Sequence, residues 1–354
     1  MQAENHPTTR VGSYLREAWY PVAWLDEIGH APFGRTVLDE PVVIFRNEQG
    51  TLSAIGGRCP HRFAPLRLGK CVAGGLQCPY HGLVFGTDGR CVGNPHERII
   101  PKARVPAYPL AERYGLAWLW FGAQERADPA LVPDFPFLED DRYEFVRGTI
   151  YGEGHYELYS DNILDLSHAA YLHTGLNAPA FLIGQRKFEQ EGNRVWTRIF
   201  HPNDYPSEVT AFICDVVGKK QDHWVDVRWD PPAAMTVTGF VSDPGQPKAQ
   251  SIDSPSMHVF TPESDHATYY FWAAAWRRRA DSAFTEAVRA GFLHAFENED
   301  KPMIREQSRM MGGADFWALN PILLKGDAGA VRARRTLAKL IKLEQDVAAS
   351  EDAP

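Results

Sequence analysis

Two short pairs of cysteine and histidine constrain this chain more than any other feature. Residues 58–82 read RCPHRFAPLRLGKCVAGGLQCPYHG, with Cys59 two positions before His61 and Cys78 three positions before His81. Pairs this close fit on tight loops, and the surrounding glycines and prolines supply the turns that such loops need. Two thiolates and two imidazoles suit either a tetrahedral zinc ion or a cluster of two irons and two sulfides.

The order of these ligands favours the cluster. A typical zinc finger has a cysteine pair followed by a histidine pair on a helix, and this segment has neither property. Each loop instead offers one cysteine and one histidine, which suits a cluster with cysteines on one iron and histidines on the other. Histidine ligation raises the reduction potential above that of all-cysteine clusters, so such a centre accepts single electrons from a low-potential donor.

The stretch DNILDLSHAAYLHTG, which begins at Asp161, carries a second group of polar residues. On a helix, the three-residue spacing of Asn162, Asp165 and His168 lines them along one face. His173 follows His168 by five residues, which turns an ideal helix by about 140 degrees. The two histidines can share a metal only if the helix bulges or ends between them, so we expect a distortion from Ala169 to Leu172.

Two imidazoles and one carboxylate form the ligand set of non-haem Fe(II) oxygenases, which leaves positions open for dioxygen, water or substrate. The residues leave the source of the carboxylate open, because Asp161, Asp165 or an acid on a distant element can supply it. The alternative is a buried helix whose histidines are simply hydrogen-bonded. Two histidines, an aspartate and an asparagine within twelve residues favour the metal site.

The pattern of the 354 residues predicts two domains. Short β-type runs such as PVVIFRN and GLAWLWFG, separated by turns, predict an all-β domain over residues 15–122. Residues 123–142 are rich in proline, aspartate and glutamate and indicate a linker. Residues 143–349 mix strand-type runs, such as TYYFWAAAW and HWVDVRW, with helical runs, such as NILDLSHAAYLH, and predict an α+β domain.

Composition argues against several classes of protein. The net charge of -8 disfavours general nucleic-acid binding. No apolar run approaches the roughly 20 residues of a membrane span and the first residues show no signal-peptide pattern, so we expect a cytoplasmic protein without a membrane segment. An odd number of cysteines, five, does not suit a secreted disulfide framework. No G-x-G-x-x-G follows a strand, so the sequence shows no sign of a bound nicotinamide or flavin and implies a separate reductase.

The joint presence of CPH, CPYHG and NILDLSHAAYLH resembles the oxygenase (α) subunit of Rieske-type non-haem iron oxygenases. The resemblance extends from about Val22 to about Glu344. Within that family, CPYHGL, DNILDLSH, HVFTPESDHATYYFW and ENEDKPMIREQ are similar to the vanillate O-demethylase and dicamba monooxygenase branch. This resemblance implies an N-terminal all-β Rieske domain and a C-terminal helix-grip-like domain, in which helices flank an antiparallel sheet.

The resemblance also implies a ligand set. The [2Fe-2S] cluster would be held by Cys59, His61, Cys78 and His81, and a mononuclear Fe(II) by His168, His173 and Asp300. Among the acids beside Asp300, Glu297 and Glu299 are adjacent candidates for the same role, and an ordinary exposed acidic helix face is the alternative to a ligand.

Three further roles follow from the resemblance. Asp165 would bridge His81 of one subunit to His168 of its neighbour, which requires a homotrimer. Asn162 would lie near the iron as an outer group, or would cap the start of its helix. His258 would bind a substrate carboxylate or phenol, or would make a structural hydrogen bond.

The predicted activity is O-demethylation of a methoxylated aromatic acid with dioxygen and electrons from a separate NAD(P)H-dependent flavin/iron-sulfur reductase. Hydroxylation of the methoxy carbon gives a hemiacetal that collapses to a phenol and formaldehyde. The alternative activity is methyl-group or ring hydroxylation of another aryl acid, of the arylsulfonate or arylcarboxylate type. Two other classes remain open: an electron carrier would need only residues up to about 122, and a zinc-stabilised binding protein would leave Asp165 and Asp300 without a role.

Overall fold

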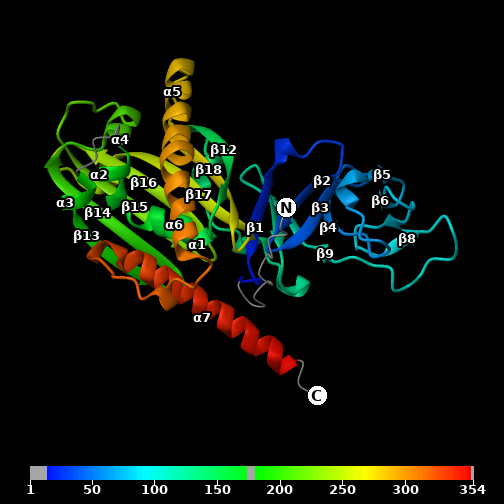
Figure 1. Ribbon diagram of the computed structural model, residues 1–354. Helices are drawn as coiled ribbons and strands as arrows, with labels where there is room; N and C mark the ends of the chain where they lie inside the picture. The colour runs from blue at the N-terminus through cyan, green and yellow to red at the C-terminus, as the bar shows by residue number, and fades with distance from the viewer. Residues whose placement is uncertain (1–13, 174–179, 352–354) are drawn as a thin grey trace. The chain divides into compact units, whose positions relative to one another are not determined.

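The computed structural model describes residues 14–173 and 180–351. The chain divides into two compact units (Figure 1). The first contains residues up to Val132, residues 261–265 and the chain from Ile341 onward, and the second contains residues 133–260 and 266–340. The division at Val132 falls inside the stretch that the sequence indicates as a linker. The first unit also contains two later segments, which a single boundary along the sequence does not predict.

The first unit is built from three small β-sheets of antiparallel strands. Its runs of β-branched and aromatic residues form strands, including the longest one, because such side chains pack well on a pleated sheet. One sheet has the order β1-β11-β10, the second β2-β3-β4-β9 and the third β5-β6-β7-β8. The strands are β1 Trp19–Trp24, β2 Phe33–Val37, β3 Glu40–Arg46, β4 Leu52–Gly56, β5 Lys70–Val72, β6 Gly75–Gln77, β7 Val84–Phe85, β8 Cys91–Gly93, β9 Ala107–Tyr108, β10 Leu110–Arg113 and β11 Leu116–Trp120.

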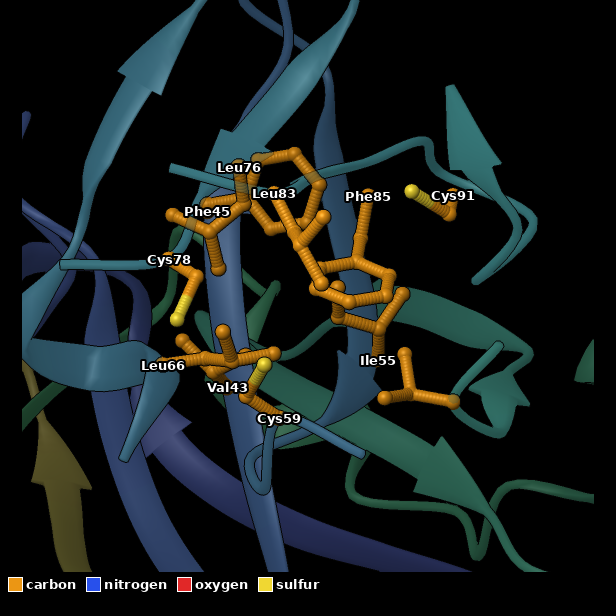
Figure 2. Packing of buried hydrophobic residues seen from close by; sticks show 11 residues of the cluster. Val43, Phe45, Ile55, Cys59, Leu66, Leu76, Cys78, Leu83, Phe85 and Cys91 are labelled. Carbon is orange, nitrogen blue, oxygen red and sulfur yellow. The ribbon is translucent and has the colours of Figure 1, made fainter. Parts of the chain in front are cut away.

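A buried hydrophobic cluster joins two of these sheets and supports the cysteine loops (Figure 2). Phe45 from β3, Ile55 from β4 and Phe85 from β7 are among its fully buried members. Cys59 and Cys78 belong to the same cluster, and Figure 2 shows them apart from Cys91. The two loop cysteines are therefore anchored by the core of the unit, whereas the loops themselves extend beyond it.

A seven-stranded sheet dominates the second unit (Figure 1). Its order is β12-β18-β17-β16-β15-β14-β13, so most neighbours in space are also neighbours in sequence. The pairs with a defined register are antiparallel, and β12 runs opposite β18 over its whole length. The strands are β12 Tyr143–Glu153, β13 Gln185–Glu191, β14 Arg194–Asp204, β15 Gln221–Asp230, β16 Ala234–Ser242, β17 Ile252–Ser264 and β18 Ala267–Arg277.

Helices complete the second unit and confirm the predicted α+β class. They are α1 Tyr156–Leu164, α2 Ala169–Leu172, α3 Ala180–Ile183, α4 Glu208–Ile213, α5 Ser282–Leu293, α6 Lys301–Met311 and α7 Ala328–Glu351. Among the described residues, no helix has both the length and the apolar character needed to cross a bilayer.

One long helical segment, from α5 through α6, carries Asp300, the predicted acidic ligand of the iron. Asp281 caps its start by accepting a hydrogen bond from the Phe284 amide at 3.1 Å, and Gly312 ends it in a left-handed conformation with φ 61°. Between α5 and α6 the helix widens into a π-helical segment, His294–Asp300. Such insertions are often found at functional sites, and this one ends at a predicted iron ligand, Asp300.

Candidate metal centres

The two cysteine loops of the first unit close in the same way. The amide of Phe63 donates to the carbonyl of Cys59 at 2.9 Å, and the amide of Gly82 donates to the carbonyl of Cys78 at 3.2 Å. Both residues at the fourth loop position are left-handed, with φ 58° at Phe63 and 75° at Gly82. Glycine adopts this conformation without steric cost, which explains why a glycine follows the second Cys/His pair.

The four predicted cluster ligands differ in their exposure. Cys59 and Cys78 are buried, at 1% and 3% exposure, whereas the His61 side chain is exposed. The His61 and His81 rings lie edge to face with centroids 4.5 Å apart. Burial, with the neighbouring Cys78, raises the pKa of the Cys59 thiol to about 11. Buried thiols and more exposed imidazoles suit a two-iron cluster that binds cysteines at one iron and histidines at the other.

These donors do not converge as a zinc site requires. Ligands at zinc distances of about 2.0 to 2.3 Å crowd around a single point. In the described part of the chain, one group of three histidine, cysteine or acidic residues has ligand atoms that all lie within 4.8 Å of one another. That group does not include the four Cys/His residues of these loops. The spread of the Cys/His donors fits a two-iron cluster better than a single ion.

That convergent group is His168, His173 and Asp300 in the second unit. The Asp300 Oδ1 atom lies 3.4 Å from His168 Nε2 and 3.5 Å from His173 Nε2. His173 and Asp300 are buried, at 7% and 5% exposure. Burial works to lower the pKa of His168, but the Asp300 carboxylate and the Asp165 carbonyl outweigh it and raise the pKa. The site therefore favours positive charge, as a cation site should.

The other ring nitrogen of each histidine has a partner that fixes the ring. His168 Nδ1 donates to the Asp165 carbonyl at 2.8 Å, and His173 Nδ1 lies 2.8 Å from Glu299 Oε2. These contacts place the proton on Nδ1 and leave Nε2 of both rings to face Asp300 as a metal donor. Glu299 thus contacts a predicted ligand through its outer nitrogen, while the adjacent Glu297 pairs with Lys301 at 2.6 Å.

The predicted helix distortion is present, but its predicted position is wrong. The chain leaves the helical conformation at Asp165, with φ -122° and ψ 95°, and resumes as a 3₁₀ turn over Leu166–His168. Ala169–Leu172, where we expected the distortion, is a regular α-helical turn with His173 at its end. The rings nevertheless meet, with centroids 5.2 Å apart, because His168 enters from the tighter turn. The expected single helical face through Asp165 is therefore also wrong.

Asn162 lies beside the convergent group. Its Nδ2 donates to Asp300 Oδ1 at 3.0 Å and lies 3.3 Å from His168 Nε2. It lies in the last turn of α1, whose N-cap is His155, so the capping alternative is wrong. Asn162 is placed to hold the Asp300 carboxylate.

The Asp165 carboxylate bonds to the main chain of its own turn. Its Oδ1 accepts from the Ser167 amide at 2.9 Å, which caps the 3₁₀ turn. The carboxylate also lies against Gly326, where an added Cβ would come within 2.3 Å of Oδ2. The structural link from Asp165 to His168 is thus the main-chain carbonyl, and the half-exposed carboxylate remains available for the predicted bridge to another subunit.

A buried ion network anchors the helix that carries Asn162. Arg334 of α7 approaches Asp161 Oδ2 with Nη2 at 2.7 Å and Glu157 Oε2 with Nη1 at 2.9 Å. Burial raises the pKa of Asp161 to about 6, against the opposing effect of Arg334. Since Asp161 precedes Asn162, this network sets the position of α1 over the histidines. Sequence reasoning missed it because it joins residues 173 positions apart.

An apolar pocket of about 160 Å³ opens onto the convergent group. Phe181 and Phe292 are among its aromatic lining residues. His258 also lines it, at 3% exposure.

His258 is held by two partners within the protein. The Tyr270 hydroxyl lies 2.5 Å from its Nδ1, and Ser256 Oγ lies 2.8 Å from its Nε2. Burial lowers the pKa of His258 to about 3 and raises that of Tyr270 well above its usual value. Tyr270 therefore donates to Nδ1, and Nε2–H donates to Ser256, which in turn donates to the Val237 carbonyl. These bonds match the structural alternative for His258.

The fold and the two centres define an oxygenase that combines a Rieske cluster with a mononuclear non-haem iron. The chain belongs to this family: residues 18–109 match the Rieske [2Fe-2S] domain, and residues 153–343 match the vanillate O-demethylase oxygenase C-terminal domain. Membership confirms the enzyme class and the two cofactors predicted from the sequence.

Individual relatives point to dealkylating oxygenases. The chain is 37% identical to the oxygenase component of chloroacetanilide N-alkylformylase from Rhizorhabdus wittichii strain DC-6, over 94% of this chain and 97% of that one. It is 35% identical to the oxygenase component of dicamba O-demethylase from Stenotrophomonas maltophilia, over 94% and 99%. A crystal structure of dicamba monooxygenase with 3,6-dichlorosalicylic acid matches with a TM-score of 0.87 at 34% identity, over 94% and 99%. The protein is therefore an oxygenase component of the O-demethylase and N-dealkylase type that works with a separate reductase.

Proposed function

We propose that this protein O-demethylates a methoxylated aromatic compound. The observation that carries the proposal is the triad of His168, His173 and Asp300 at one side of an apolar pocket of about 160 Å³. An engineered apolar cavity of about 150 Å³ binds benzene, so one aromatic ring fits beside the triad. We propose the predicted ligand sets for the two cofactors: Cys59, His61, Cys78 and His81 for the cluster, and the triad for the iron.

When bound, the cluster and the iron supply electron relay and dioxygen activation. The balanced reaction converts the methoxyarene, dioxygen, two electrons and two protons into a phenol, formaldehyde and water. In this reaction the methoxy carbon is oxidised, and the resulting hemiacetal loses its bond to the aryl oxygen as the hydroxyl proton leaves. The chain's own residues orient the ring, keep bulk water from the pocket and hold the Nε2 atoms of His168 and His173 toward Asp300.

The electron route proposed from the sequence passes between copies of the chain. We propose a homotrimer in which His81 of one copy meets Asp165 of its neighbour. Apolar side chains lie exposed near both ends of this route: Phe63 and Tyr80 beside the cluster histidines, and Ile322 and Leu324 close in sequence to Gly326, against which Asp165 lies. Contact between copies would remove such side chains from water. We also propose that the separate reductase is an NAD(P)H-dependent flavin/iron-sulfur protein.

Reconstitution tests this function. Protein prepared under anaerobic conditions should be red-brown with about three irons and two acid-labile sulfides per chain. With a reductase, it should release formaldehyde from methoxyarenes in proportion to the phenol formed. Colourless protein that contains zinc and no acid-labile sulfide would contradict the proposal. A hydroxymethyl or ring-hydroxylated product without formaldehyde would instead establish the alternative hydroxylation.

A further inference from the structure

The inner pocket, defined as the cavity of about 160 Å³ beside the triad, has no cationic wall. Among the described residues that line it, none is lysine or arginine. Its walls are mostly aliphatic and aromatic, with Phe181, Val225 and Phe292 among them.

Histidine does not replace the missing cation. His258 is the lining histidine other than the two triad members, and both of its ring nitrogens are engaged by Tyr270 and Ser256. Its burial also keeps the imidazole neutral. Apart from the iron site itself, the described lining offers no positive charge to pair with a substrate carboxylate, so burial of one away from the iron is unfavourable.

Uncharged polar groups, by contrast, have suitable partners. The hydroxyls of Thr210 and Ser254 converge near Gly239, where an added Cβ would lie 2.9 Å from Ser254 Oγ and 3.2 Å from Thr210 Oγ1. Both residues line the inner pocket. Hydroxyls can donate to an amide or ether oxygen of a substrate without requiring it to be ionised.

A second, larger cavity adjoins the inner pocket. This outer cavity of about 780 Å³ lies between α4, with its following turn, and α5. The two cavities share Val209, Ile213, Gly291 and Phe292 as lining residues. The charged side chains of the outer cavity, Asp204, Glu208 and Lys219, are of mixed sign, while most of its wall is apolar. Because one ring takes up most of the inner pocket, this adjoining space is where a further apolar substituent has room.

We propose that the substrate is an uncharged aromatic compound with an apolar substituent that occupies the outer cavity. This inference rests on the proposed function, and it departs from the aromatic acid predicted from the sequence. The chemistry of recognition is thus a neutral ring in the inner pocket, an amide or ether oxygen near Thr210 and Ser254, and an alkyl group beside Gly291.

The first experiment compares binding of three probes to the iron-loaded protein by calorimetry. The probes are ortho-methoxybenzoate, ortho-methoxybenzamide and N-butyl-ortho-methoxybenzamide, which share the oxidisable group. We expect the amide to bind at least roughly tenfold more tightly than the benzoate, because only the benzoate carries a charge into the pocket. We expect the butyl group to add roughly another tenfold. Benzoate binding as tight as that of the amide, or no binding of the amide, would overturn the inference.

A substitution at the junction tests the outer cavity. A Cβ added at Gly291 meets no atom within 4 Å, and Gly291 lines both cavities, so Gly291→Leu adds its side chain where the two adjoin. Binding of the butyl amide should weaken roughly tenfold, while the unsubstituted amide changes by less than about twofold. Ala290→Leu, at an exposed neighbouring position of α5, is the matched control and should change neither. An unchanged affinity of Gly291→Leu for the butyl amide would overturn the assignment of the outer cavity.

A gain-of-function variant and a product assay complete the design. Thr210→Lys places an ammonium group in the inner pocket and should raise benzoate affinity roughly tenfold while weakening amide binding. Failure to improve benzoate binding would contradict the argument from charge. Formaldehyde release is measured separately: tight amide binding without formaldehyde would reject the proposed O-demethylation and leave the inference on substrate charge standing.

Discussion

Glu299 should control iron affinity through His173, although we do not propose it as a ligand. Its Oε2 lies 2.8 Å from His173 Nδ1, and the two side chains are only 15% and 7% exposed. A hydrogen bond between a carboxylate and the outer nitrogen of a metal-bound histidine fixes the ring and makes the other nitrogen a better donor. Loss of such a partner typically lowers metal affinity about 10- to 100-fold, which corresponds to about 1.4 to 2.8 kcal/mol.

Two substitutions separate charge from position. In Glu299→Gln the amide oxygen can still accept from Nδ1, but a neutral acceptor gives roughly half the strength of a charged one, so we expect about a tenfold loss. Glu299→Ala removes the acceptor altogether, and we expect about a hundredfold loss. The assay is anaerobic titration of Fe(II) into apoprotein against a competing chelator, with the visible spectrum of the cluster as a check that the first domain is intact.

Glu297 provides the matched control. It lies in the same π-helical segment but pairs with Lys301 at 2.6 Å and makes no contact with His173 in the described residues. Glu297→Gln should therefore bind Fe(II) like the wild type. Wild-type affinity in Glu299→Ala, or an equal loss in Glu297→Gln, would refute the assignment of Glu299 as the residue that positions His173.

Three further predictions concern the bridge, the cluster loop and α1. Asp165→Asn should retain both metals and lose coupled turnover in steady-state assays; normal turnover would argue against the relay between subunits. Gly82→Ala should lower stability by about 1 kcal/mol in thermal unfolding followed at the cluster absorbance, because φ is 75° and the new Cβ would lie 3.2 Å from Pro95, whereas Gly29→Ala, in open space, should have no effect. Burial raises the pKa of Asp161 to about 6, above its unfolded value, so the folded state binds this proton more tightly and stability should fall, by at most roughly 3 kcal/mol, as the pH rises from about 4 to about 6. Denaturant unfolding across that range should show this slope in the wild type, and an equal slope in Asp161→Asn would exclude Asp161 as its source.

Local patterns predicted much of the fold. The strands β15 and β18, and the helical run that becomes α1 and α2, follow from hydrophobic runs and periodicity that act within one element. The two Cys/His loops could also be predicted, because the ligands of each loop and its turn residues lie close together in the sequence. The break at Asp165 could not, since the helical pattern continues through it, and the side-chain bond to the Ser167 amide that stabilises the turn is a competing local structure.

The contacts between distant residues could not be predicted from one sequence. Nothing in the chain's pattern selects Arg334 as the partner of Asp161, or Tyr270 as the partner of His258. The choice of Asp300 over its acidic neighbours came from the resemblance, and the geometry supports it, because Asp300 lies closest to both Nε2 atoms while Glu299 lies at the opposite edge of one ring. A π-helical segment places two successive acids at these different positions.

The two histidines of the triad are held by different kinds of hydrogen-bond partner. This difference links the predictions for Glu299 and Asp165. The outer nitrogen of His168 is bonded to the main-chain carbonyl of Asp165, which no side-chain substitution removes, whereas that of His173 is bonded to the side chain of Glu299. Iron affinity should therefore respond to substitution at Glu299 and not at Asp165, while electron transfer between subunits should respond to substitution at Asp165. If Asp165→Asn loses iron as readily as Glu299→Gln does, then its side chain supports His168 in a way that the main-chain bond does not explain, and the separate roles assigned to the two acids would fail together.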